Sequence, residues 1–209
     1  MTIKLYSRLG WGSAIVEAQL DWYGLPFIVE PVGDMLRDTE ARRKIEGINP
    51  LAQLPTLVMS DGTVMSESAA ITLLLADITG EDSLVPRPAA RERAAFLRWL
   101  VFIVANIYPT FTYADVPARF VEVEAAQAPF VATLDAYRQK LWRQLDDEAG
   151  ASWFLGERFS ALDIFIAVMT RWGPKRPWFE KETPKLFAIA RAVDTLPQLA
   201  DMWKRNTAS

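Results

Sequence analysis

The sequence predicts a small α/β domain followed by an all-helical domain, and three observations lead to this prediction. Residues 1–79 alternate short β-rich runs with stretches of helical periodicity. Residues 80–91 contain Pro86 and Pro88 close together, which is typical of a linker. Residues 92–209 show helical periodicity to their end. Because 51% of the 209 residues are hydrophobic, the chain has ample apolar mass for both cores.

The first domain begins with a predicted strand, helix and strand. Residues 2–6 and 26–32 are β-rich runs, and residues 13–24 between them form a helical apolar face. Ser13 suits the N-cap of this helix, and Gly24 suits its C-terminal stop. A right-handed crossover through the helix makes the two strands parallel.

The rest of the first domain is predicted as a helix, a hairpin and a second helix. Residues 35–47 form a polar, exposed helix. Asp61-Gly62 separates two β-branched runs, which predicts a hairpin with a type I′ turn. Residues 67–80 then form an apolar helix that stops at Gly80. The resulting order, β-α-β-α-β-β-α, is the thioredoxin-like arrangement.

The second domain carries two clear helical patterns and one sharp local signal. Residues 128–150 form a long amphipathic helix. Ser160 and Asp163 have the spacing of a capping box, with Phe159 able to pack on Ile164, so Asp163 is predicted to be structural. One apolar stripe at helical spacing should be core: Phe96, Trp99, Leu100, Ile103 and Ile107.

Composition excludes several kinds of chemistry. The chain has neither cysteine nor histidine. It therefore has no disulfide, no thiolate nucleophile, no Ser–His–Asp triad and no cysteine- or histidine-ligated metal. Any reaction must use hydroxyls, carboxylates, Lys, Arg or backbone amides, or a reactive group that the ligand brings itself.

Charge and hydropathy limit the partners and the location. The net charge is −3, and the longest basic run, Arg42-Arg43-Lys44, suits a solvated helix face, so no nucleic-acid partner is expected. Residues 96–111 are the most apolar stretch, but they are interrupted by Arg98 and Asn106 and are expected to be too short for a membrane span. No signal peptide is visible, and a cytoplasmic location is expected.

Residues 52–68 combine two features that a hairpin alone does not need. A proline before the third strand of this fold commonly has a cis peptide, which would leave the backbone of Leu54, before Pro55, as an unpaired edge for an extended ligand. Glu67 and Ser68 fall in the first turn of the next helix, where N–H groups favour a carboxylate and Glu67 suits an ammonium group. The alternative is that Ser66 and Ser68 only cap the helix and that Glu67 only complements its dipole.

These segments together resemble the cytosolic glutathione transferase family. The resemblance rests on "NPLAQLPTLVMSDGTVMSESAAI", the Pro-rich linker and "FLGERFSALDIFIA", and it covers the whole chain. It implies that Leu54, before cis-Pro55, pairs through its backbone with the cysteinyl unit of glutathione. It also implies that Glu67 and Ser68 bind the γ-glutamyl end, with Gln53 as a further contact. Glutathione would be a co-substrate, no other cofactor is implied, and the ligand would supply the thiol that the chain lacks.

The family activates this thiol near the end of the first strand, and here the sequence departs from the pattern. The position that carries the activating residue in many relatives holds Trp11 or Gly12. The candidate hydroxyls are those of Ser13 first and Ser7 second, while Tyr6 is expected to pack within the strand. Backbone amides of the loop are the alternative to a hydroxyl.

The resemblance also implies a pocket for an electrophile between the two domains. Trp11, Tyr108, Phe111 and Tyr113 are its expected wall, although such an aromatic cluster is also common in ordinary cores. The predicted protein is a homodimeric glutathione transferase that acts on a hydrophobic electrophile, in detoxification. The alternatives are a glutathione-dependent disulfide or peroxide reductase without an enzyme cysteine, and a binding protein without catalysis.

Overall fold

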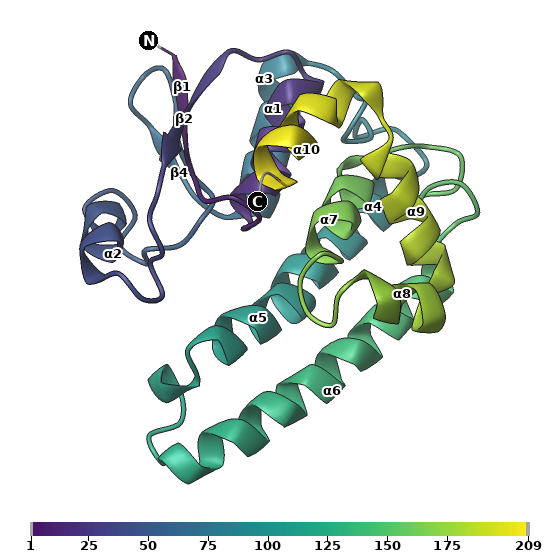
Figure 1. The fold of residues 1–209 in the computed structure, drawn as a ribbon. Helices are drawn as coiled ribbons and strands as arrows, with labels where there is room; N and C mark the ends of the chain where they lie inside the picture. The colour runs from purple at the N-terminus through teal and green to yellow at the C-terminus, as the bar shows by residue number, and fades with distance from the viewer. Residues whose placement is uncertain (1, 208–209) are drawn as a thin grey trace.

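A four-stranded mixed sheet forms the first domain in the computed structural model, which describes residues 2–207 (Figure 1). The strand order is β2-β1-β3-β4. β1 and β2 are parallel, as predicted, and β3 runs antiparallel to β1 and to β4. The strands are β1 (Ile3–Ser7), β2 (Phe27–Pro31), β3 (Thr56–Val58) and β4 (Val64–Met65).

Three helices complete the first domain. α1 (Ser13–Trp22) and α3 (Ser68–Thr79) pack against each other, whereas α2 (Thr39–Glu46) lies apart from them in Figure 1. α2 begins later than predicted, because the Asp38 side chain accepts hydrogen bonds from the N–H groups of Glu40 and Ala41 and so caps the helix there. The predicted β-α-β-α-β-β-α order is confirmed.

The hairpin between β3 and β4 has a different turn from the one predicted. A type I′ turn needs positive φ at both central residues. Here Gly62 has a φ of 92°, while Asp61 is not among the residues with positive φ. The N–H of Gly62 bonds to the carbonyl of Met59, and the N–H of Met59 bonds to the carbonyl of Thr63. The loop is therefore one residue longer than a two-residue turn, with glycine alone in the left-handed region.

Helices make up the second domain, which confirms the predicted fold class. The long α6 starts and ends a few residues before the predicted helix over 128–150. The helical segments are α4 (Arg93–Phe102), the π-helical turn η1 (Ile103–Ile107), α5 (Tyr108–Asp115), η2 (Pro117–Arg119), α6 (Glu124–Glu148), α7 (Ala161–Met169), α8 (Arg176–Glu182), α9 (Pro184–Asp194), η3 (Pro197–Leu199) and α10 (Ala200–Thr207).

α7 is the central helix of this domain, and every one of its residues is buried. Its N-terminus has the predicted capping box, in which the carboxylate of Asp163 accepts the N–H of Ser160 at 2.7 Å. The same carboxylate accepts the N–H of Phe154 at 2.7 Å, so it also fixes the loop before the helix. The structural role predicted for Asp163 is confirmed.

One helical run is longer than the sequence led us to expect. Arg93–Asp115 is a continuous run of 23 residues that is long and apolar enough to span a membrane by length and composition alone. The expectation that this stretch was too short was therefore wrong, because η1 and α5 extend α4 past Pro109. All five side chains of the predicted apolar stripe are buried in the core that both domains share.

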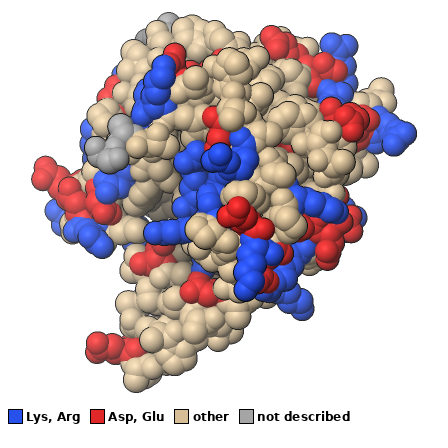
Figure 2. Space-filling model, turned by 45° about the vertical axis from the view of Figure 1, so that its right-hand side comes forward, with Lys and Arg blue, Asp and Glu red and all other residues tan. Residues whose placement is uncertain are grey.

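The C-terminal helix ties the two domains together. α10 lies beside α1 (Figure 1), and Arg205 pairs with both Glu17 and Asp21 of that helix. Asn206 donates a hydrogen bond to Glu17 at 2.8 Å. On the face shown in Figure 2, acidic and basic side chains lie next to one another, with Lys and Arg gathered near its middle.

Candidate functional site

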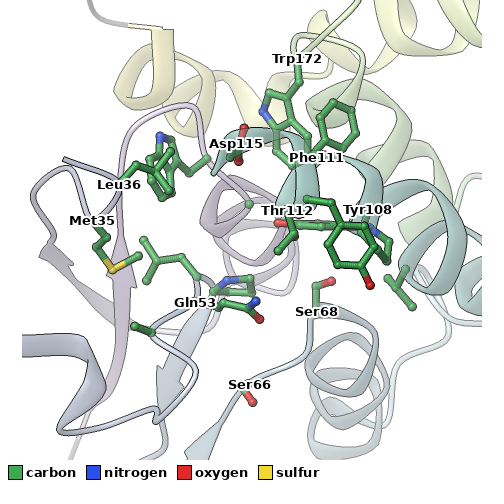
Figure 3. A pocket seen from close by; sticks show the side chains of 18 of the residues that line it. Met35, Leu36, Gln53, Ser66, Ser68, Tyr108, Phe111, Thr112, Asp115 and Trp172 are labelled. Carbon is green, nitrogen blue, oxygen red and sulfur yellow. The ribbon is translucent and has the colours of Figure 1, made fainter. Parts of the chain in front are cut away.

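A cavity of about 570 Å³ opens between the two domains (Figure 3). The first domain contributes the loop after β1, the segment before β3 and the start of α3, and the second contributes α5 and the turn after α7. The structure brings nine of the predicted site residues together around this cavity: Trp11, Gln53, Leu54, Pro55, Glu67, Ser68, Tyr108, Phe111 and Tyr113. Its volume is within the range of small-molecule sites.

The segment before β3 presents a fixed backbone edge. The Leu54-Pro55 peptide bond is cis, and pairing of β3 with β1 begins only at Thr56. The carbonyl of Gln53 accepts hydrogen bonds from the Thr56 hydroxyl at 2.8 Å and from the Asn49 side chain at 3.2 Å. These bonds hold the segment around Leu54, which lines the cavity and is not paired with a neighbouring strand. Sequence reasoning gave Asn49 no role, although its place before Pro50 is typical of a turn.

The start of α3 has unoccupied capping positions that face the cavity. Its N-cap is Glu67, and no side chain makes a capping hydrogen bond there, so neither Ser66 nor Ser68 acts as the cap. The first N–H groups of a helix have no partner within the helix. Ser68 is 6% exposed and projects from this end of the helix toward the cavity (Figure 3). This end of α3 therefore offers hydrogen-bond donors and a partial positive charge to an anion.

Two residues beside the cavity have an unusual backbone conformation. Glu67 has a φ of 64°, and Ala52, just before Gln53, has a φ of 48°. Residues other than glycine seldom adopt positive φ, and such conformations cost roughly 1–3 kcal/mol where they occur. Both residues line the cavity. Strained backbone therefore gathers where the ligand is expected, which is typical of functional sites.

The two serines predicted to activate a thiol lie beneath the cavity wall. Ser13 is fully buried as the first residue of α1, whose N-cap is Gly12 rather than Ser13. The hydroxyl of Ser7 donates to that of Ser13 at 3.0 Å. The Ser13 hydroxyl also bonds to the N–H and the carbonyl of Arg8, each at 3.2 Å. Neither serine is among the residues that line the cavity, whereas Trp11 and Gly12 are. Tyr6 packs against a small apolar cluster that includes Ile45 of α2.

Aromatic side chains of the second domain form the opposite wall. The ring of Trp172 makes edge contacts with Tyr108 at 5.4 Å and Phe111 at 5.2 Å between centroids. The indole N–H of Trp172 donates to the carbonyl of Gly10 at 2.7 Å. Phe111 is buried in the core as well, so the cluster serves both the core and the cavity. Trp172 was missed because the apolar run that contains it was interpreted as one buried helix, whereas α7 ends at Met169 and Trp172 lies in the turn that follows.

Charged groups of both signs surround the cavity. Arg42 of α2 and Arg119 of η2 line it, as do Glu67 and Asp115. Burial raises the pKa of Tyr108, and the negative charges of Asp115 and Glu67 raise it further. Among residues 2–207, no cluster of three carboxylates has the arrangement of a metal site.

The comparisons with known proteins agree with this geometry. Residues 13–78 match the family model of the glutathione S-transferase N-terminal domain. The chain is 36% identical to YncG of Escherichia coli K12, an uncharacterized GST-like protein, and the match covers 98% of both chains. It is 27% identical to the glutathione S-transferase GstA of Escherichia coli O157:H7, over 81% of this chain and 82% of that one. A sphingomonad glutathione S-transferase structure, complexed with glutathione, matches 99% of this chain and 100% of its own, with 26% identity and a TM-score of 0.70.

Proposed function

Because this chain belongs to the glutathione transferase family, we propose that it binds glutathione in the cavity between its domains and directs the thiolate at a hydrophobic electrophile. One observation carries the proposal. The uncapped start of α3 and the free backbone edge at Leu54 line the same cavity, beside an aromatic wall. A peptide with an α-carboxylate and an α-ammonium group has the chemistry that these two features need.

The γ-glutamyl end of glutathione suits the start of α3. The α-carboxylate would accept hydrogen bonds from the first N–H groups of the helix and from the Ser68 hydroxyl. The ammonium group would pair with Glu67, whose positive φ holds its backbone at the turn into the helix. The two charges of one ligand end would then meet complementary groups on adjacent residues.

The middle of the tripeptide suits the Leu54 edge. An extended ligand can pair with an unpaired backbone N–H and carbonyl as an added strand does. The side chain of Gln53 points into the cavity near this edge (Figure 3) and offers a further polar contact. At the other end, the glycyl carboxylate would have Arg42 as a partner of opposite charge.

The second substrate would occupy the side of the cavity that the aromatic residues line. Trp11, Tyr108, Phe111 and Tyr113 favour an apolar, flat electrophile. Catalysis would come from holding the thiolate and the electrophilic carbon together. Assembly as a homodimer in the cytoplasm is part of the proposal, and light scattering of the purified chain tests the assembly.

Calorimetric titration with glutathione tests the proposal. We expect binding in the micromolar to low-millimolar range, with Ser68→Ala about tenfold weaker because the ligand carboxylate loses a donor. Ser60→Ala is the matched control, since Ser60 is exposed in the hairpin turn. Absence of binding to the folded wild-type protein would refute the proposal.

Turnover separates conjugation from its alternatives. With glutathione and a set of aryl halides, we expect conjugate formation. Reduction of a small mixed disulfide in the absence of conjugation would favour the reductase, with two glutathione molecules reacting in one site. Glutathione binding without either reaction would favour a binding protein.

A further inference from the structure

Gly12 lies against a hydroxyl that comes from the other domain. A Cβ atom built on Gly12 would lie 1.8 Å from the hydroxyl oxygen of Tyr108 and 3.1 Å from the carbonyl oxygen of Leu54. The φ of Gly12 is −58°, which any residue can adopt. The Tyr108 hydroxyl therefore occupies the volume that a side chain of residue 12 would fill, and such a side chain would have to displace it.

Several contacts hold the Tyr108 ring in this place. η1 directly precedes it as a π-helical turn, in which the N–H of Tyr108 bonds to the carbonyl of Ile103. The extra residue of such a turn rotates the rest of the helix by about 100°. Ile103 and Ile107 remain buried, while Tyr108 faces the cavity. The ring of Trp172 then packs edge-on against Tyr108.

The Tyr108 hydroxyl remains protonated when a thiol ionises. Burial is the largest cause that raises its pKa, and the charges of Asp115 and Glu67 act in the same direction. No hydrogen bond within residues 2–207 contributes to that shift. A phenol in this state donates a hydrogen bond and does not itself become the nucleophile.

The Tyr108 hydroxyl lies where the proposed function would place the thiol of glutathione. The backbone of Leu54 is where the cysteinyl unit would pair under the proposed function, and Gly12 lies next to the Leu54 carbonyl. Ser13 and Ser7 donate and accept within their own buried network, away from the cavity lining. The Tyr108 hydroxyl, which lies against Gly12, is thus on the cavity side of the loop, whereas the two serines are not.

We infer that Tyr108 donates a hydrogen bond to the sulfur of bound glutathione and so stabilises its thiolate, in place of a side chain from the loop after β1. This inference rests on the proposed function. The thiol proton passes to solvent when glutathione binds, and the hydroxyl of Tyr108 keeps its own proton. Tyr108 would then be a catalytic residue supplied by the second domain.

The test measures ionisation of the bound thiol directly. The thiolate absorbs in the ultraviolet, so a pH titration of the glutathione complex gives the pKa of the bound thiol without a second substrate. In Tyr108→Phe we expect that pKa to rise by about one pH unit, a roughly tenfold smaller ratio of thiolate to thiol. The affinity for S-methylglutathione, which has no thiol proton, should stay the same. Tyr137→Phe, on the exposed face of α6, is the matched control.

Two outcomes would overturn the inference, and they are distinguishable from failure of the proposed function. If Tyr108→Phe binds glutathione with the wild-type thiol pKa, Tyr108 is not the donor, although the proposed function stands. If Ser13→Ala raises the thiol pKa while Tyr108→Phe does not, the buried serine network activates the thiol. If the wild-type protein does not bind glutathione, the proposed function itself fails, and this inference fails with it.

Discussion

Trp172 donates its indole N–H to the carbonyl of Gly10 at 2.7 Å, across 162 residues of sequence. The contact joins the turn after α7 to the loop after β1, and thus one domain to the other at the edge of the cavity. The N–H of Gly10 donates to the side chain of Asn206 at 3.3 Å, so both backbone groups of this glycine are held by the second domain. The position of Trp11 and Gly12 relative to the cavity therefore depends on the second domain.

The first prediction concerns Trp172→Phe. The smaller ring keeps the edge contacts with Tyr108 and Phe111 but leaves the Gly10 carbonyl without its donor. We expect a loss of about 1 kcal/mol in the free energy of unfolding, because one hydrogen bond is lost. We also expect several-fold weaker binding of glutathione, since the loop beside the cavity is less fixed. Urea denaturation and calorimetry measure the two effects.

Trp178→Phe is the control for this substitution, because Trp178 packs on Phe179 away from the cavity. It should affect stability alone. Equal glutathione affinity of Trp172→Phe and the wild type would contradict the role given to the Trp172–Gly10 contact.

The second prediction concerns Gly12→Ala. The added methyl group would overlap the Tyr108 hydroxyl, so the loop or the tyrosine must shift. We expect a loss of about 1–3 kcal/mol in stability, as for other overpacked sites, and at least tenfold weaker glutathione binding. Gly47→Ala is the matched control, since an added Cβ at Gly47 would make only ordinary contacts of 3.8 Å and longer.

The double variant Gly12→Ala with Tyr108→Phe sharpens this test. Removing the hydroxyl removes the shortest contact, so part of the lost stability should return. Additive losses in the double variant would show that Gly12 and Tyr108 do not interact, which would contradict the packing described above.

The parts of the structure that follow local rules were predictable from the sequence. Strand and helix order followed from periodicity, and the Asp163 capping box followed from residues three apart. The turn at Asp61-Gly62 was mispredicted because the same dipeptide fits both a two-residue loop and a longer one. The residues that the first domain contributes to the cavity were also predictable. Pro55 marks the segment before β3, and Glu67 and Ser68 mark the start of α3.

The direction in which an individual side chain points depends on tertiary contacts, and the periodicity of the sequence does not predict these contacts. The N-cap of α1 is Gly12, so Ser13 is the first residue of the helix and not its cap. Its hydroxyl therefore bonds to Ser7 and Arg8 instead of capping the helix. The fit between Gly12 and Tyr108 depends on how the two domains dock. Trp172 follows a helix that is buried on all sides, and no sequence pattern indicates that its indole reaches the first domain.

The third prediction concerns pH and the buried carboxyl group of Asp163. Burial raises the pKa of this group to about 7, partly offset by hydrogen bonds from Phe154 and Ser160. In the unfolded chain the pKa of an aspartate is about 3.9. Between these two values the folded protein binds more protons than the unfolded chain. The stabilisation from protonation is therefore complete below about pH 4 and is lost as the pH rises through about 7.

The comparison of wild type with Asp163→Asn isolates this effect, because the two proteins share every other titrating group. We expect the variant to be the less stable at pH 5. The hydroxyl oxygen of the protonated carboxyl group can still accept a hydrogen bond, whereas the NH2 group of asparagine would face a backbone N–H without accepting one. As the pH rises from 5 to 8, the wild type should lose about 2–3 kcal/mol relative to the variant. Urea denaturation at each pH gives both free energies of unfolding. Parallel stability curves over this range would mean that folding does not raise the pKa of the Asp163 carboxyl group into this range, and that its hydrogen bonds at least offset its burial.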